Sequence, residues 1–448
     1  MKKIIFFLLI LLFSSCKEEN NNFNSNNFSS DLRTPEEAIV EVSQLWNQVF
    51  SDYSTKGNFS MPSVDNINII SSIRTKGINS TNIDSVAYVV NFVNDNGFAI
   101  VRTDKKEAPI LALTDSGNID VDILQNPDLL DYTYDIEGES ILYLLLHNAL
   151  VYNDEISQNI QSGLSYEYST NSENDEWFID EKYGPFVQVK WGQKYPFNKF
   201  MPLADSTYTS FGLNTPYKGH MPAGCVMIAA AQMMVTNRRP EIFHGLINGW
   251  YMTDLDDIST YMDYSFYQYD NLYLDDLEEP FKTYLNGVAD MIRLLAQYFE
   301  ASYSSSGTGA YTDLAMEKIA TVIDPDYYGD YRTIYTYSPS NSGVYTAASC
   351  GKPMIIRGQR QYLHNGVTMT SGHAWITDGY LSRHKYTEDG IISEELVHMN
   401  WGWQGQCDGY FDYGVLDILQ RVEKDEIDTN PNSLINRNYN LSVRYYMY

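Results

Sequence analysis

A single cysteine, Cys225, stands where a glycine turn passes into a long apolar run, and this junction limits how the chain can fold. The residues that follow it, 226–234, are small or apolar except for Gln232, so they favour a helix that is buried on nearly all sides. In the first helical turn, unpaired backbone N–H groups and the positive end of the helix dipole favour a thiolate, the nucleophilic form of cysteine. The pattern predicts a central helix whose N-terminus carries a reactive thiol, and a core cysteine is the common alternative.

A histidine suited to pair with this thiol lies far downstream. His373 follows Cys225 by 148 positions, and in one class of thiol-dependent enzymes the separation is roughly 130–150 residues. Its neighbours, a glycine and an alanine, leave room for a substrate backbone. His398 and His220 are the main competitors, although His220 is too close to Cys225 in sequence to come from an opposite wall unless its loop folds back.

Three further side chains complete a candidate constellation. Asn400 is predicted to accept the ring N–H of His373 and fix its orientation, and Trp401 to shield that hydrogen bond from water. Gln193 is the upstream side-chain donor for an oxyanion, with the backbone N–H of Cys225 as the second donor. A lone glutamine is a weak signal, and it gains weight only from the order Gln, Cys, His, Asn.

Charge and cysteine content narrow the possible partners. The formal net charge of −28 should repel nucleic acid and anionic lipid surfaces. Four cysteines occur, and if Cys16 is lipidated then an odd number remains, so at least one thiol stays free. Cys225 is the natural candidate, whereas Cys350 and Cys407 could form a disulfide or remain two separate buried thiols.

The N-terminus indicates export. After a basic start, Ile4–Phe13 is apolar but too short to span a bilayer, and small residues lead to Cys16. Residues 1–15 therefore resemble a bacterial lipoprotein signal peptide with Cys16 as the lipidated residue, and a plain secretory signal is the alternative. Residues 16–30 read as a polar tether, whose Lys17–Glu19 resembles an export tag for the outer face of the outer membrane.

A first, small α+β domain is expected over residues 31–165. Thr34 and Glu37 form a capping box for a helix that starts at Pro35. Asn94–Gly97 is a strong hairpin signal between two apolar strands, and Ile141–Tyr152 predicts a packed helix.

A polar stretch, 157–175, separates this domain from a second one over 176–448 and is a plausible cleavage region. The second domain holds every candidate catalytic residue. It begins with helices, at Cys225 and at Val288–Phe299, and becomes strand-rich toward its end. The predicted strands are Pro353–Arg357, His373–Gly379, Glu395–Met399 and Tyr439–Met447. The fold class is therefore α+β, with a helical lobe and an antiparallel β lobe on either side of a cleft.

These motifs together resemble the streptopain family of bacterial papain-like cysteine peptidases. The matching segments are Trp191–Asn198, Pro222–Met234, Gly351–Gly358, Ser371–Gly379 and His398–Phe411. The first domain resembles the inhibitory propeptide of that family, above all over Ala87–Asp104 and Ala108–Asp115. The resemblance covers most of the chain.

The resemblance implies a zymogen whose propeptide inhibits the catalytic domain and is removed by proteolysis. It implies Cys225 as nucleophile, His373 as general base and acid, Gln193 as oxyanion donor, and Asn400 with Trp401 as support. The loop Ser304–Ala310 is similar to a glycine–serine loop beside the substrate cleft. Two features depart from the family: Cys407, and an acidic loop over His384–Glu395, both expected to flank the cleft.

The sequence thus predicts a surface-anchored endopeptidase that acts on protein or peptide substrates without a metal or other cofactor. No paired Cys or His residues have the spacing of a zinc site. Two alternatives stay open: an amidase or transpeptidase acting on cell-wall peptides, and a catalytically idle surface binding protein.

Overall fold

The structure is a computed structural model, and the chain is described here over most of its length beyond the N-terminal thirty residues. The described ranges are 31–50, 60–71, 85–129, 135–156, 176–244, 249–259, 279, 281–323, 332–334, 342–364, 367–416 and 442–447. The predicted signal peptide, the tether with Cys16 and the polar stretch 157–175 lie outside these ranges.

The N-terminal unit is a four-stranded antiparallel arrangement with helices on it. In chain order its elements are α1 (Pro35–Phe50), β1 (Val64–Ser71), β2 (Ser85–Phe92), β3 (Phe98–Arg102), β4 (Ile110–Thr114), α2 (Val121–Gln125) and α3 (Glu139–Ile156). The predicted capping box is confirmed, because the Thr34 N–H donates to Glu37 at 2.8 Å and the Glu37 N–H donates to Thr34 Oγ1 at 3.3 Å. The predicted hairpin joins β2 to β3, with positive φ at Asn94, Asp95 and Gly97.

The second unit supplies the other helices and strands of the described chain. Its helices are α4 (Cys225–Asn237), α5 (Met252–Ser259), α7 (Phe281–Tyr298), α8 (Thr312–Ile323) and α9 (Ser342–Ser349). Its longer strands are β5 (Phe178–Tyr183), β11 (Met354–His364), β12 (Val367–Thr387), β13 (Gly390–Asn400), β14 (Gly409–Asp412) and β15 (Ser442–Met447). The short strands are β6 (Ile242–His244), β7 (Gly249–Tyr251), β8 (Ser302–Ser304), β9 (Gly307–Gly309) and β10 (Arg332–Ile334). Helices followed by strands match the predicted α+β fold class.

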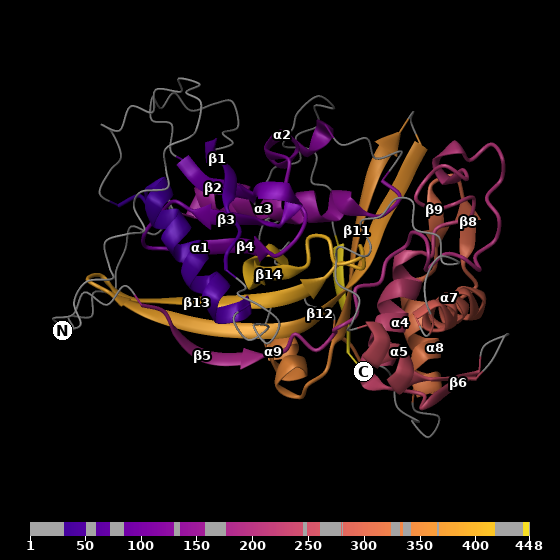
Figure 1. The fold of residues 1–448 in the computed structure, drawn as a ribbon. Helices are drawn as coiled ribbons and strands as arrows, with labels where there is room; N and C mark the ends of the chain where they lie inside the picture. Colours follow the sequence, from indigo (N-terminus) through magenta and orange to yellow (C-terminus); the bar gives the residue numbers. More distant parts are fainter. Residues whose placement is uncertain are drawn as a thin grey trace.

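One antiparallel sheet runs through both units. Within the described residues its order is β1-β2-β3-β4-β14-β13-β12-β11-β15-β10, and β5 also pairs with β12. The two units join where β4 pairs with β14, with Leu113 opposite Tyr410 and Ala112 opposite Phe411. Figure 1 shows the N-terminal unit over the long strands β12 and β13, with α4, α5, α7 and α8 gathered at the other end. The first unit is therefore docked by backbone pairing as well as by side chains.

The hydrophobic core is shared across this junction. The side chains of α1, such as Leu45 and Trp46, are buried in one cluster with Leu381 and Leu396 of the second unit. The side chains of α3 are buried in another cluster with Trp375. Burial of large apolar side chains contributes about 1.5–3 kcal/mol each, so separating the units exposes a substantial apolar surface.

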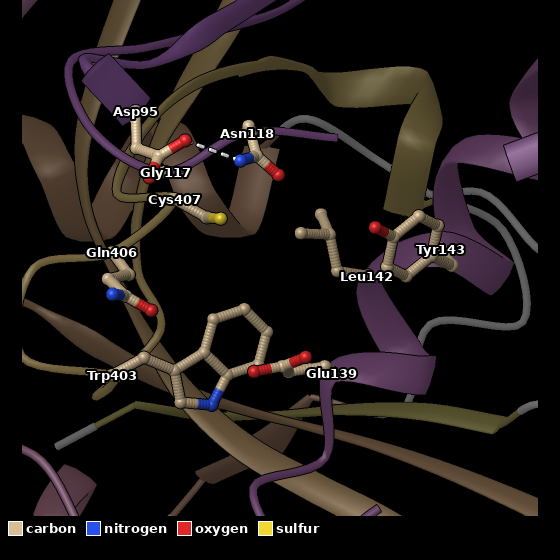
Figure 2. Close-up of a pocket in the computed structure, with 9 residues that line it drawn as sticks. All are labelled: Asp95, Gly117, Asn118, Glu139, Leu142, Tyr143, Trp403, Gln406 and Cys407. Carbon is tan, nitrogen blue, oxygen red and sulfur yellow. Dashed lines mark hydrogen bonds between the residues drawn. The ribbon is translucent and has the colours of Figure 1, made fainter. Parts of the chain in front are cut away.

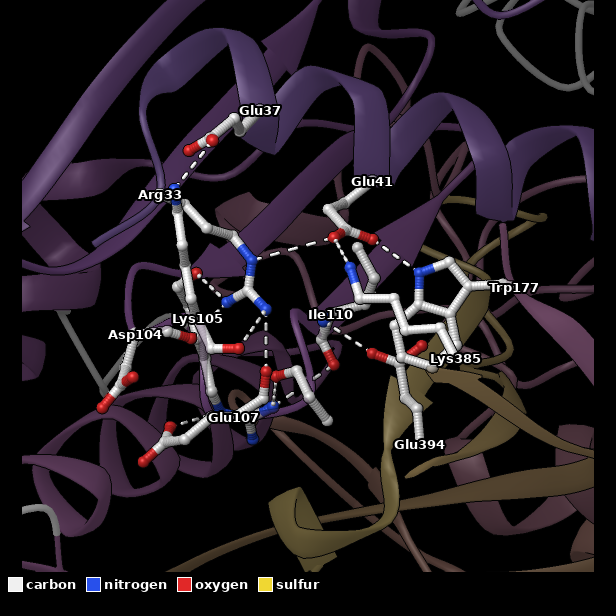
Figure 3. Close-up of polar contacts among 12 residues, drawn as sticks. Arg33, Glu37, Glu41, Asp104, Lys105, Glu107, Ile110, Trp177, Lys385 and Glu394 are labelled. Atoms are coloured by element: carbon white, nitrogen blue, oxygen red, sulfur yellow. Dashed lines mark hydrogen bonds and ion pairs between the residues drawn. The ribbon is translucent and has the colours of Figure 1, made fainter. Parts of the chain in front are cut away.

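Buried charges add to the junction (Figure 3). Glu41 of α1 receives a hydrogen bond from Trp177 Nε1 at 2.7 Å and forms ion pairs with Lys385 and, at 3.8 Å, with Arg33. Glu394 accepts a hydrogen bond from the Ile110 N–H at 2.7 Å. Trp177 is the second described residue after the predicted cleavage region, so the start of the second unit is anchored on the first.

The segment His384–Glu395, predicted as an acidic loop at the cleft, is instead the hairpin of β12 and β13. His384 pairs with Ser393 and Tyr386 with Ile391. In the sequence, acidic residues near the hairpin tip interrupt the alternation of apolar and polar side chains that would have indicated two strands. The hairpin packs on α1 and β5 and not on the candidate site. Among the helices of the described ranges, none has the length and apolar character required to cross a bilayer.

Candidate active site

Cys225 is the first residue of α4, at the place where the sequence predicts it. Residues 226–235 of this helix are all buried, whereas Cys225 is partly exposed. Gly224 precedes it with φ 88°, and a Cβ there would lie 2.9 Å from the Thr308 carbonyl oxygen. Only glycine tolerates both this backbone conformation and this approach. The glycine turn therefore aims the N-terminus of α4, with its thiol, at the β8–β9 hairpin and at β12.

His373 lies in β12, the strand that reaches Cys225 through the next residue, Ala374. The backbone N–H of Ala374, the next residue, hydrogen-bonds to Cys225. The imidazole Nε2 lies 2.7 Å from the Trp401 carbonyl oxygen, and because a carbonyl only accepts, Nε2 must carry the proton. Nδ1 is buried and has no hydrogen-bond partner. The nitrogen that remains available as a base is therefore Nδ1.

Three tryptophans hold the imidazole ring. Its centroid lies 6.0 Å from Trp375, 6.2 Å from Trp401 and 5.0 Å from Trp403, all in stacked orientations. Trp375 and Trp401 also stack on each other at 4.9 Å. The ring is thus confined to one plane in a site that excludes water.

The predicted hydrogen bond between Asn400 and His373 is not made in this structure. Asn400 Oδ1 accepts hydrogen bonds from Gln232 Nε2 and from the Gly402 N–H, both at 3.1 Å, and its amide donates to the Val189 carbonyl at 3.2 Å. The ring N–H is already engaged by the neighbouring carbonyl of Trp401. Asn400 instead ties the end of β13 to the central helix, and its support of His373 in an active form stays a prediction.

Gln193 is occupied by the first unit. Its Nε2 lies 3.4 Å from the Glu137 carbonyl oxygen, which also accepts a 2.8 Å hydrogen bond from Trp403 Nε1. The next residue, Gly138, packs against the imidazole, since a methyl group there would lie 2.7 Å from His373 Cβ and 2.8 Å from Nδ1. The segment just before α3, Glu137 and Gly138, therefore crosses the site and covers the side of His373 that carries the free nitrogen. It is called the covering segment below.

Burial keeps the candidate pair uncharged. It lowers the pKa of His373 to about 4, although the Trp401 carbonyl acts in the opposite direction. It also raises the pKa of the Cys225 thiol, against the backbone N–H groups of Ala374, Val226 and Cys225 itself. In this structure burial therefore favours the neutral thiol, and the carboxylate of Asp135 also opposes a negative charge on Cys225.

The competing histidines and cysteines have other surroundings. His398 is buried and pairs through Nδ1 with Asp378 at 2.6 Å, and His220 Nδ1 lies 2.9 Å from the Met201 carbonyl oxygen. Cys350 and Cys407 are both free, so the disulfide alternative is wrong, and Cys350 is exposed where a buried thiol was expected. In the described part of the chain, no three His, Cys, Asp or Glu side chains are grouped closely enough to hold a metal ion.

Comparison with known proteins gives the family. Residues 191–411, which include all five candidate residues, match the model described as the Peptidase C10 family. The chain is 20% identical over 334 residues to streptopain from Streptococcus pyogenes serotype M28 (strain MGAS6180), a match that covers 72% of this chain and 73% of streptopain. The chain belongs to the streptopain-like cysteine peptidases. The predicted family and enzyme class are thereby confirmed.

Solved structures from Prevotella intermedia are also similar to this streptopain-like peptidase. A fragment of prointerpain A covers 85% of this chain and 98% of its own length, at 17% identity and a TM-score of 0.44. The active wild-type interpain A cysteine protease covers 52% of this chain and 87% of its own length, at 24% identity and a TM-score of 0.34.

A cavity of about 170 Å³ lies beside the site of the streptopain-like peptidase (Figure 2). Trp403 and Cys407 line it from the second unit, and Glu139 and Tyr143 of α3 line it from the first. Burial raises the pKa of Cys407, so this thiol is not a second nucleophile. The predicted departure at Cys407 therefore lies at the junction of the two units.

Sequence reasoning missed the residues that cover and confine the site. Trp375 is visible in sequence only as an aromatic residue two positions from His373, a spacing that puts both on the same strand face. Trp403 lies two positions after Trp401, beyond the end of β13. Glu137 and Gly138 carry no local signal at all, because their position depends on the docking of the whole first unit.

Proposed function

We propose that this streptopain-like cysteine peptidase is made as a latent precursor whose first unit, residues 31–165, is an inhibitory propeptide. Proteolysis within 157–175 separates it from the catalytic unit. The observation that carries this proposal is the passage of Glu137 and Gly138 between Gln193 and His373, where a substrate backbone must lie. The neutral state of Cys225 and His373 supports it, since a thiol is a poor nucleophile.

In the active form, Cys225 and His373 form a thiolate–imidazolium pair once the segment leaves and water enters. Cys225 Sγ attacks the carbonyl carbon of the scissile peptide bond. Gln193 Nε2 and the Cys225 N–H stabilise the oxyanion, and His373 donates its proton to the leaving amine. Water, deprotonated by His373, then hydrolyses the thioester and restores the thiol. Trp401 and Trp403 keep the imidazole in place during both steps.

The proposed location follows from the sequence alone. Residues 1–15 act as a lipoprotein signal peptide, Cys16 carries the lipid, and residues 16–30 hold the enzyme away from the membrane. The protein is then exported and anchored to the bacterial outer membrane, exposed to proteins of a host or of neighbouring cells. Labelling with a radioactive fatty acid, lost in Cys16→Ala, tests the anchor.

Gly138→Ala tests latency. The added methyl group would lie 2.7 Å from the buried imidazole, which the tryptophans prevent from moving, so the covering segment must shift. We expect an epoxide thiol inhibitor to modify Cys225 in the intact precursor about tenfold faster or more. Peptide mapping by mass spectrometry measures the modification at Cys225 alone.

Gly351→Ala is the matched control. Gly351 has φ 71°, close to the 80° of Gly138, but a Cβ there meets nothing within 4 Å. The two variants share the backbone strain and differ in the contact with His373. Equal modification rates in both variants and in wild type would contradict the proposed role of the covering segment.

A further inference from the structure

We propose that Lys194 and Tyr217 form a carboxylate-binding subsite, and that the mature enzyme prefers substrates with glutamate immediately before the scissile bond. This inference rests on the proposed function, because it takes Gln193 as the oxyanion donor. Glu137 of the covering segment stands in for the substrate residue. Its side chain shows what the surrounding pocket recognises.

The contacts to Glu137 are those of a built pocket for an acid. Lys194 Nζ lies 2.8 Å from Glu137 Oε2, and the Tyr217 hydroxyl donates to Oε1 at 3.4 Å. Glu137 is only 8% exposed, although glutamate is rarely buried without a partner. The ion pair with Lys194 is therefore the main contact that recognises the carboxylate, and the Tyr217 phenol contacts its other oxygen.

Other residues of the second unit support this pocket. Tyr217 is buried, its ring packs edge-on against Phe211 at 5.2 Å, and its carbonyl accepts a hydrogen bond from Asn198 at 3.0 Å. Burial and the nearby carboxylate raise the pKa of Tyr217, which keeps the phenol protonated and able to donate. Lys194 directly follows Gln193 in the chain, so the backbone that positions Gln193 also positions Lys194. All of these residues belong to the second unit.

The position of Glu137 relative to the reacting groups fixes which substrate residue is read. The carbonyl that faces Gln193 belongs to Glu137, and in a substrate the carbonyl at the oxyanion donor is the scissile one. The residue that carries this carbonyl also carries the side chain between Lys194 and Tyr217. The subsite therefore selects the residue before the cleaved bond.

A peptide series that differs only at this residue tests the preference. The processed enzyme from the full chain is assayed on peptides with Glu, Gln or Lys there, and mass spectrometry establishes the cleaved bond. Because a hydrogen-bonded charge pair adds about a factor of ten or more in transition-state binding, kcat/KM for Glu should exceed that for Gln about tenfold. Lys194→Met should abolish the difference, and Lys194→Glu should favour the Lys peptide.

The control is Lys199→Met, which removes a lysine from the same segment. Lys199 Nζ bonds to Asn286 Oδ1 at 3.1 Å, away from Glu137, so this variant should keep the wild-type preference. Cleavage of the Gln peptide with no gain for Glu overturns the subsite and leaves the peptidase proposal intact. A preference that survives Lys194→Met overturns it as well. Failure to cleave any peptide, with no inhibitor modification of Cys225, overturns both.

A second measurement needs no turnover. In the intact precursor, Glu137→Gln and Lys194→Met should each speed modification of Cys225 by an epoxide inhibitor. Each change removes the Glu137–Lys194 ion pair and so weakens the binding of the covering segment at the site. If the carboxylate and the ammonium recognise each other, the double variant should be no faster than the single variants. Rate increases that multiply in the double variant show two independent effects and contradict the subsite.

Discussion

A Cys225→Ala precursor should have no measurable peptidase activity, a loss of at least about 10⁴-fold, since removing the nucleophile of a comparable triad costs this much or more. The methyl side chain cannot form the thioester, and neither Cys350 nor Cys407 lies at the N-terminus of α4 to replace it. The purified precursor should also remain uncut during incubation, if maturation depends on its own activity. Casein hydrolysis measures the first effect and N-terminal sequencing the second.

Cys350→Ala is the matched control, because Cys350 is an exposed free thiol directly after α9. It should retain wild-type casein hydrolysis and the wild-type maturation product. Self-maturation of Cys225→Ala at the wild-type rate would contradict the assignment of the nucleophile. Digestion of cell-wall peptides in place of casein by the wild-type enzyme would favour the amidase alternative.

Local patterns predicted the elements that depend on neighbouring residues. The start of α4 at Cys225 follows from Gly224 and an apolar run, and the start of α1 follows from the Thr34–Glu37 capping box. Both are short-range effects of backbone conformation and hydrogen bonding. Cys225 also begins a helix and His373 also lies in a strand, as the local patterns predict.

Long-range pairing explains what was missed. The first unit meets the second through β4 and β14, segments about three hundred residues apart, and no sequence window contains both. Glu137 and Gly138 reach the site only as a result of this docking. In this covered form, burial raises the pKa of Cys225 and lowers that of His373, so the thiolate–imidazolium pair predicted for the active enzyme stays a prediction.

The largest stability effect should come from Arg383→Met. Arg383 is fully buried, its Nε donates to Glu394 Oε2 at 2.6 Å, and its guanidinium lies 4.2 Å from the ring centre of Trp177. Methionine keeps contact with Trp177 but leaves Glu394, which is 2% exposed, without its charged partner. Breaking a buried ion pair in this way costs about 3–5 kcal/mol. Urea denaturation of the precursor, followed by tryptophan fluorescence, measures the change.

The pH dependence of the free energy of unfolding distinguishes loss of the Arg383–Glu394 ion pair from simple loss of packing. Burial already raises the pKa of Glu394 in wild type, and loss of the arginine charge removes an opposing influence. The folded variant therefore binds a proton more readily than the unfolded chain, so its stability rises as the pH falls toward the pKa of the folded state. The loss in free energy of unfolding of Arg383→Met relative to wild type should accordingly be smaller at pH 5 than at pH 8. A deficit that is equal at both values would attribute the loss to packing.

Glu300→Gln is the control for charge removal as such. Glu300 forms a 2.8 Å ion pair with Lys318, but its side chain is 74% exposed, so water replaces the lost interaction. This variant should leave the urea midpoint unchanged. Because Arg383 also donates to Gln48 of α1 at 2.9 Å, Arg383→Met should weaken the hold of the first unit on the second. Cys225 in that precursor should then react faster with an epoxide inhibitor, whereas destabilisation without faster modification would mean that the buried ion pair supports the sheet and not latency.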